Sequence, residues 1–245
     1  AITNDDQPLA DEVANRMADA AWAMRDALNQ GGTTIDGALT RAHSAQTGPI
    51  VLFDVGDNVG GGSPGDSTHI LHAARRLGIS GILQAVCDPQ VVQVCAAAGV
   101  GGRIRAAIGG KCDDQHGAPF PVEGIVTALT DGKYEETGPT HGGFRFYDDG
   151  PSCALRTDDG FTLVLTSLAA GSASLQQFRT LGIEPTDMKI IVAKGVHSPR
   201  PAMEPIAKEL MWVASPGVTT ADLSNFTYRH RRVPLYPLEE NASWR

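Results

Sequence analysis

The sequence predicts an α/β protein with a mostly parallel sheet between two layers of helices, forming three layers, and a β-rich antiparallel insertion. Continuous apolar runs without alternation are typical of strands buried on both faces, and they occur at residues 49–54, 82–86 and 188–193. Segments with helical three- and four-residue spacing lie between the early runs. From residue 100 to 166 the pattern becomes alternating and glycine-rich, which favours hairpins.

These patterns divide the chain into three parts of one domain. Residues 1–99 form a first α/β part with a glycine-rich loop, residues 100–170 the insertion, and residues 171–245 a second α/β part with an irregular tail. The first part opens with an amphipathic helix over residues 8–30 and a second helix over 34–44.

Local signals place the remaining elements. A helix is expected to follow Asp66-Ser67-Thr68, with Asp or Ser as its N-cap, and another begins at Asp88-Pro89. We expect hairpin turns at residues 131–132 and 159–160 and a late strand of the insertion at 161–166. Two later helices are expected at 175–181 and 201–210, and a last strand at 211–214.

Composition limits the function classes. The 245 residues carry a formal net charge of −8, which argues against a nucleic-acid partner, because such proteins usually present a basic face. The single dense basic run, 229–232, is better explained by salt bridges or helix-end charges. No apolar run approaches the ~18 residues of a membrane span, so we expect no membrane partner. Four cysteines without a CxxC pair favour reduced thiols and a cytoplasmic location.

The best candidate site is the loop from Asp54 to Thr68, between a predicted buried strand and a helix. Its five glycines let backbone amides converge, and the helix N-terminus adds partial positive charge, so the loop can hold a carboxylate, a phosphate or another oxyanion. It is neither a Walker loop nor a GxGxxG fingerprint. Two alternatives stay open: its acids bind a divalent cation, or Asp66 caps the helix while Asp54 and Asp57 bond loop amides.

A second segment, residues 194–200, directly follows a predicted buried strand. If that strand is parallel to the first, Lys194 and His197 lie at the same edge of the sheet as the glycine-rich loop and can contact an anionic or carbonyl group. The alternative is a solvated loop that caps a helix. His69 and His72 have a spacing compatible with metal ligands, but an ordinary helix face is the preferred interpretation. We find no HExxH motif and no Ser-His-Asp signature.

Residues 57–68 resemble the signature of the C-terminal domain of the microcystinase C family of zinc metallopeptidases, which usually carries Pro where this chain has Val59. The resemblance continues through residues 194–197, 205–207, 215–220 and 228–238. It therefore covers essentially the chain from residue 8 onward.

The resemblance implies that this chain is the C-terminal half of a longer protein. In that family the zinc ligands lie in short Asp-x-His segments of the N-terminal half, so we assign no metal ligand and no catalytic residue here. Zinc, the N-terminal half and a peptide or amide substrate are the implied cofactor and partners, and a homo-oligomer is compatible with them. The isolated chain is expected to be inactive.

The substrate-binding residues that motif position implies are Asp57, Asn58, Gly60, Gly61, Gly62, Gly65, Asp66, Thr68, Lys194 and His197. Two other functions stay open at this point. The loop can bind a small anion or carboxylate without any chemistry in this chain, or the chain is a structural half that packs against a partner domain.

Overall fold

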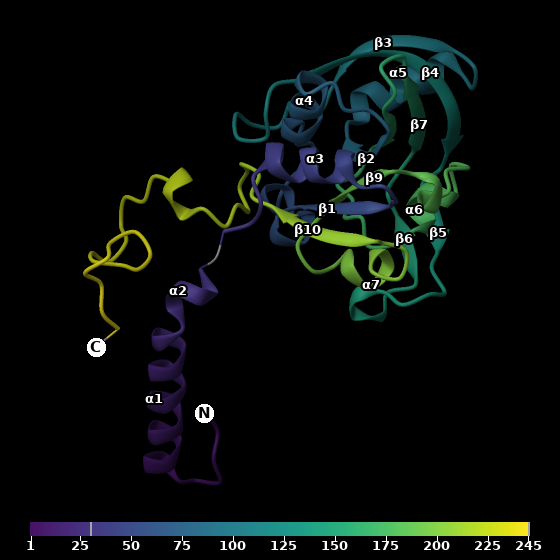
Figure 1. Cartoon of the computed structure of the whole chain (residues 1–245). Coiled ribbons are helices and arrows are strands. Elements are labelled where there is room, and N and C mark those ends of the chain that lie inside the picture. Colours follow the sequence, from purple (N-terminus) through teal and green to yellow (C-terminus); the bar gives the residue numbers. More distant parts are fainter. Residues whose placement is uncertain (30, 245) are drawn as a thin grey trace. The chain divides into compact units, whose positions relative to one another are not determined.

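The computed structural model describes residues 1–29 and 31–244 and divides into two compact units (Figure 1). Unit 1 comprises Ala1–Gly31 with Asp222–Arg245, and unit 2 comprises Gly32–Ala221. The strands, all in unit 2, are β1 Ile50–Asp54, β2 Ile82–Cys87, β3 Arg103–Ile108, β4 Phe120–Thr130, β5 Lys133–Glu135, β6 Phe146–Asp148, β7 Ser152–Thr157, β8 Thr162–Thr166, β9 Ile190–Lys194 and β10 Glu209–Val213.

One eight-stranded sheet forms the centre of unit 2, in the order β10-β1-β9-β2-β8-β7-β4-β3. The pairings from β10 to β8 are parallel, and those from β8 to β3 are antiparallel. The predicted α/β class with an antiparallel part is confirmed. The antiparallel strands extend the same sheet, however, because β8 pairs in parallel with β2 while forming a hairpin with β7.

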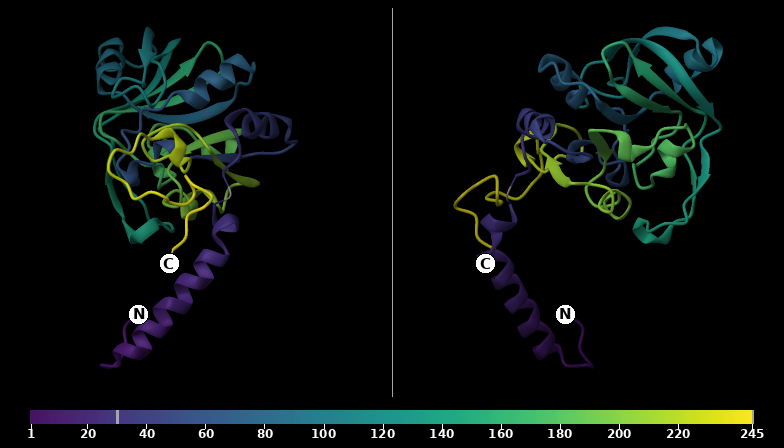
Figure 2. Two further views of the ribbon diagram at one scale, coloured as in Figure 1. Left: turned by 90° about the vertical axis from the view of Figure 1, so that its left-hand side faces the viewer. Right: turned by 45° about the vertical axis from the view of Figure 1, so that its right-hand side comes forward.

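Helices cover both faces of this sheet, which gives the predicted three layers (Figure 2). They are α3 Ile35–Ser44, α4 His69–Arg76 and α5 Pro89–Ala98 on one face, and α6 Gln176–Arg179 and α7 Arg200–Met203 on the other. Consecutive residues of β1 contribute to opposite cores, with Leu52 packed under the first group and Phe53 under the second. A central parallel strand buried on both faces explains why its sequence is uniformly apolar.

Two local predictions in unit 2 are wrong. The turn at residues 131–132 does not reverse the chain: β4 continues into β5, and the reversal falls between β5 and β6, which pair with each other. The predicted helix over 201–210 is a single turn, α7, and β10 already begins at Glu209. The turn at residues 159–160 is confirmed as the connection of the β7–β8 hairpin, where Gly160 adopts a φ of +86°.

Unit 1 contains α1 Gln7–Ala23 and α2 Arg25–Leu28, so the helix predicted over residues 8–30 is interrupted at Met24. Residue 30 lies outside the described residues. The side chain of Asp6 caps α1 by accepting from the Leu9 amide. Within α1 only Ala10 is buried. The tail packs on this helical segment through an edge-to-face contact between Trp22 and Tyr236.

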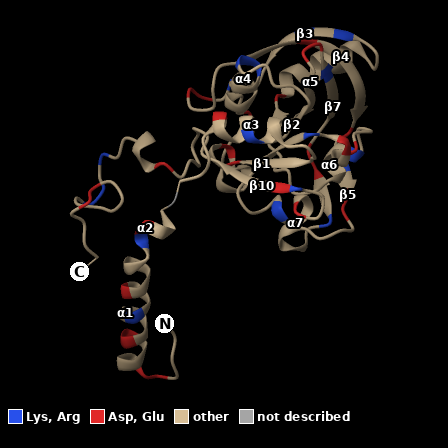
Figure 3. Ribbon diagram, viewed as in Figure 1, with Lys and Arg blue, Asp and Glu red and all other residues tan. Residues whose placement is uncertain are grey.

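Charged side chains of both signs are interspersed along the ribbon (Figure 3). No helix among the described residues is long and apolar enough to cross a membrane. All four cysteines are free thiols.

Candidate functional site

The glycine-rich loop follows β1 as two short 3₁₀ turns, Val55–Asp57 and Val59–Gly61, before α4 begins. Glycine is required at residue 56 because a Cβ there would lie 2.2 Å from the carbonyl oxygen of Pro216. Gly65 has a φ of +76°, a conformation that favours glycine. Glycine at these two positions lets the loop fold back on itself within a few residues.

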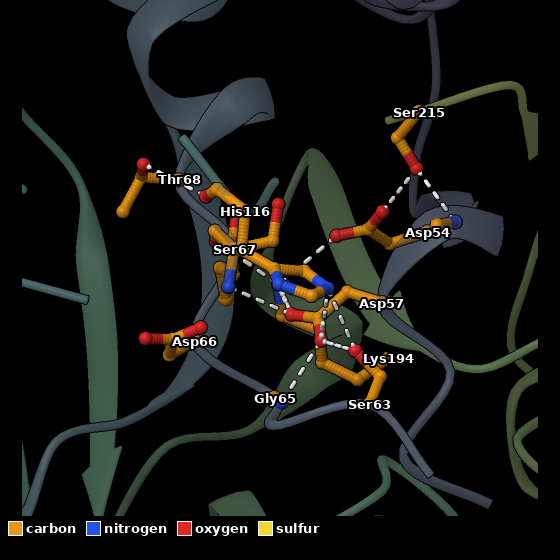
Figure 4. A network of polar contacts seen from close by, with 12 residues as sticks. Asp54, Asp57, Ser63, Gly65, Asp66, Ser67, Thr68, His116, Lys194 and Ser215 are labelled. Carbon is orange, nitrogen blue, oxygen red and sulfur yellow. Dashed lines mark hydrogen bonds and ion pairs between the residues drawn. The ribbon is translucent and has the colours of Figure 1, made fainter. Parts of the chain in front are cut away.

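The centre of the loop is the carboxylate of Asp57, which is completely buried (Figure 4). Its Oδ1 accepts from the Gly65 amide at 2.8 Å and from Ser63 Oγ at 2.5 Å. Its Oδ2 accepts from the Ser67 amide at 2.8 Å. The amides that the sequence predicted to converge on an oxyanion thus converge on a carboxylate of the same loop.

The compensating cation is Lys194, the last residue of β9. Because β9 pairs in parallel with β1, Lys194 stands directly beside Asp54 in the sheet. Its Nζ lies 2.9 Å from Asp54 Oδ2, 2.7 Å from Asp57 Oδ2 and 3.1 Å from the carbonyl oxygen of Ser67. An ammonium has three donors, and all three are used here. Asp54 also accepts from Ser215 Oγ, which in turn accepts from the Gly56 amide.

Burial and charge act in opposite directions on this network. Burial alone would raise the pKa of Asp57, but the Lys194 charge and the hydrogen bonds from Lys194, Ser63 and Ser67 lower it to about 2. Burial alone would lower the pKa of Lys194, yet the carboxylates of Asp54 and Asp57 raise it above its ordinary value. The net pKa shifts, downward for Asp57 and upward for Lys194, both favour the charged forms, so the network is a buried ion cluster.

Asp66 does not cap α4, contrary to the prediction. The residue before the helix is Thr68, whose side chain makes no capping bond. Asp66 Oδ2 instead accepts from the amides of Lys111 at 2.8 Å and Cys112 at 3.0 Å. Thr68 Oγ1 donates to the carbonyl oxygen of Ala118 at 2.7 Å. Both residues therefore tie the glycine-rich loop to residues 109–118, the connection between β3 and β4.

Sequence reasoning assigned no role to residues 109–118, yet His116 is completely buried against the site. Its Nδ1 lies 2.8 Å from Asp113 Oδ1, and its Nε2 lies 3.0 Å from Ser63 Oγ and 3.4 Å from the Val218 amide nitrogen. The signal available in the sequence was the run Asp113-Asp114-Gln115-His116-Gly117 between two predicted strands.

That run contains one Asp-x-His triplet, from Asp114 to His116, of the kind that the resemblance places in the other half. The triplet does not act as a metal site here, because both ring nitrogens of His116 are engaged by Asp113 and Ser63. His69 and His72 are engaged too: their Nε2 atoms lie 2.9 Å from the carbonyl oxygens of Gln115 and Ala118 respectively.

Across residues 1–29 and 31–244, no three His, Cys, Asp or Glu side chains are grouped as metal ligands would be. The acids of the glycine-rich loop are bonded to Lys194, to hydroxyl groups and to backbone amides instead. The described residues therefore do not fit a zinc ion, and no chemistry through a metal is derived from them.

The outward part of the loop consists of Asn58 and Gly60–Gly62, which we call the glycine rim. Its three glycines are exposed, and Asn58 is half-buried. The rim is closed internally, because the amides of Gly61 and Gly62 donate to the carbonyl oxygens of Asn58 and Val59. The Asn58 amide donates to Thr219 Oγ1 at 2.9 Å.

The predicted site residues thus fall into two groups. Nine belong to the glycine-rich loop and its buried network, either on the rim or beneath it: Asp57, Asn58, Gly60, Gly61, Gly62, Gly65, Asp66, Thr68 and Lys194. Lys194 is not solvated as the alternative interpretation required, and its donors are not free for a ligand. His197 is exposed in the segment after β9, and its side chain forms no hydrogen bond with the described residues of this network.

A family model described as MlrC C-terminus matches residues 52–230. Microcystinase C of Sphingomonas sp. is 25% identical over 241 residues, which cover 97% of this chain and 45% of that protein. A crystal structure of a protein from Mesorhizobium sp. BNC1, provisionally named a metallopeptidase, matches with a TM-score of 0.80 and 27% identity, over 94% of this chain and 45% of that chain. The chain spans less than half the length of each of these relatives.

Proposed function

Because this chain belongs to the family of MlrC C-terminal domains, we propose that it is one part of a zinc-dependent metallopeptidase or amide hydrolase. The metal ligands are contributed by an N-terminal half of the kind that the longer relatives carry. The observation that carries the proposal is the pairing of an exposed glycine rim with a buried ion network and no metal-ligand group among the described residues. The chain supplies a shaped wall, and zinc is bound elsewhere.

In this proposal the two groups of residues have different tasks. The glycine rim contacts the peptide or amide substrate, since it is the part of the loop that solvent reaches. Asp57, Gly65 and Lys194 hold the rim in shape from beneath, and Asp66 and Thr68 do so from the side. His197 is proposed as a substrate contact from outside the network, on motif position alone.

The two other functions compare differently with the structure. Binding of a small anion by the loop amides would require free donors, and those of Gly65 and Ser67 are already bonded to Asp57. A purely structural half, which packs the glycine rim against a partner domain, would leave the rim exposed in this chain alone, as a substrate wall does. Rim variants separate that last alternative from a substrate wall.

Gly60 is the sharpest position for such a variant. A Cβ at Gly60 meets only Asn58 Oδ1, at 3.4 Å, so a side chain there is tolerated by the fold and projects from the rim. With the zinc-binding half supplied and a peptide substrate, we expect Gly60→Val to lower kcat/KM by about tenfold or more, because misplaced substrate loses rate steeply. Gly31→Val, where nothing lies within 4 Å of the added Cβ, is the matched control.

Unchanged kcat/KM in both Gly60→Val and Asn58→Ala would remove the rim from the substrate site. The metal part of the proposal is tested on the chain alone by equilibrium dialysis against zinc. We expect no stoichiometric tight binding, and one equivalent of zinc held through dialysis would contradict the assignment of the metal to the other half.

A further inference from the structure

His116 joins three segments that are distant in the sequence. It belongs to residues 109–118, it contacts the glycine-rich loop through Ser63, and it contacts the segment after β10 through the Val218 amide. Its own carbonyl oxygen accepts from the Thr68 amide at 2.9 Å. Because the imidazole is completely buried and both of its ring nitrogens have partners, its position in the structure is closely constrained.

Ser63 is the link from His116 to the glycine rim. Its Oγ lies between His116 Nε2 and Asp57 Oδ1, and its amide donates to the carbonyl oxygen of Asn58, the first residue of the rim. The other side of His116 is held by Asp113, whose two carboxylate oxygens lie 2.8 and 2.9 Å from Nδ1. The result is a continuous chain of contacts from Asp113 to the rim.

Asp113, His116 and Ser63 have the hydrogen-bond order of a catalytic triad, but the surroundings argue against a nucleophilic serine. Ser63 is only 4% exposed. Its Oγ lies beside the negative charge of Asp57, which would oppose an oxyanion, and the nearby Gly65 and Ser67 amides that could stabilise one are bonded to Asp57.

We propose that His116 and Asp113 are positioning residues, which hold the glycine rim in its substrate-binding shape by way of Ser63. This inference rests on the proposed function for its biological meaning, but the positioning itself is a property of this chain. His116 acts on the rim through its Nε2 contact, and Asp113 fixes the imidazole so that this contact is kept.

Two substitutions of His116 separate its two contacts. His116→Asn places an amide near the position of Nδ1, so it keeps the contact with Asp113 and loses Ser63. His116→Gln places an amide near the position of Nε2, so it keeps Ser63 and loses Asp113. Because the proposal assigns the effect on the rim to the Nε2 side, the Asn variant should disturb the rim more than the Gln variant.

The measurement is hydrogen exchange resolved by amide in the isolated chain. The rim reporters are the amides of Gly61, Gly62 and Ser63, which all donate within the loop. We expect their exchange to become about tenfold faster in His116→Asn, as for the loss of one hydrogen bond, and to change less in His116→Gln. Amides of β1 and β9 should keep their protection. His69→Gln is the matched control, because His69 bonds the same 109–118 connection without touching Ser63.

A second pair of variants tests the contact between Asp113 and His116, at the partly exposed side chain of Asp113. Asp113→Asn retains an oxygen acceptor for Nδ1 and should keep the rim protected, whereas Asp113→Ala should speed its exchange. If His116→Asn does not fold, this pair decides. Equal effects of the Asn and Gln variants at His116, or a loss of protection in β1 as large as that in the rim, would overturn the proposal.

The zinc-binding half and substrate are absent from this experiment. A failure here therefore leaves the kcat/KM effect of Gly60→Val untouched, and the two proposals can fail separately.

Discussion

Replacement of Lys194 by methionine tests whether the buried ion network holds the site together. Lys194, Asp54 and Asp57 have no exposed side-chain surface, and methionine fills a similar length without a charge. The variant leaves two buried carboxylates without their cation. Breaking a buried ion pair in this way costs about 3–5 kcal/mol of unfolding free energy, because the remaining charge is uncompensated. We expect Lys194→Met to lose that much stability at pH 7.

The change of unfolding free energy with pH distinguishes the loss of the cation from a simple loss of packing. In the natural chain the pKa of Asp57 falls from 3.8 to about 2 on folding, because Lys194 and the hydrogen bonds outweigh burial. That stabilisation, about 2 kcal/mol, is fully present above pH 3.8 and is lost as the pH falls toward 2. Without Lys194, burial dominates and raises the carboxylate pKa in the folded state. The stability of the variant should therefore decrease as the pH rises from 4 to 7.

The assay is urea unfolding followed by circular dichroism at several pH values between 4 and 7. Lys189→Met is the matched control, since Lys189 is exposed and its Nζ donates to the carbonyl oxygen of His43, outside the buried network. Its unfolding free energy should stay within about 0.5 kcal/mol of the natural chain. Two results would refute the reasoning: a loss below about 1 kcal/mol for Lys194→Met, or a stability of that variant that does not fall as the pH rises from 4 to 7.

Two further predictions concern the surroundings of this network. Gly217→Ala should destabilise by about 3 kcal/mol or more, because Gly217 has a φ of 143° and a Cβ there would lie 2.1 Å from the Gly56 carbonyl oxygen. Thermal unfolding measures this, with Gly143→Ala as a control that has positive φ but open space; equal losses in the two variants would leave only backbone strain. Cys112 should react with iodoacetamide about 100-fold more slowly at pH 8 than a thiol of ordinary pKa, because partial desolvation of this exposed residue and the Asp66 carboxylate raise its pKa to about 11. Peptide mapping follows this residue, and Asp66→Asn should speed the reaction; an ordinary rate in the natural chain would contradict the raised pKa.

The sheet and the glycine-rich loop were predictable because both leave local marks in the sequence. A strand buried on two faces must be apolar throughout, as residues 50–53 are, and a loop that folds back on itself needs glycines such as Gly56. The state of Lys194 was not predictable in this way. The sequence left a solvated loop open for this lysine, and only the pairing of β9 with β1 places it beside Asp54.

His116 and the connection from residue 109 to 118 were missed for a similar reason. Their contacts reach Ser63, 53 residues earlier, and Val218, 102 residues later, and no periodicity or spacing records such distances. The single turn of α7 was missed because helical spacing between 201 and 210 competes with the parallel pairing of β10 on β1, and long-range pairing prevailed. Local signals predicted the framework, whereas the connections between loops come from the topology.

The carboxylate of Asp57 inside its own loop changes what a glycine-rich stretch after a strand signifies. Such a stretch indicates that backbone amides are brought together around negative charge, but it does not tell whether that charge belongs to a bound ligand or to a side chain of the protein. In this protein the negative charge is the side chain of Asp57 in the same loop, with Lys194 from a neighbouring strand as its counter-ion. The amides of Gly65 and Ser67 are thereby occupied, and the part of the loop that solvent reaches consists of three uncharged glycines and the half-buried Asn58.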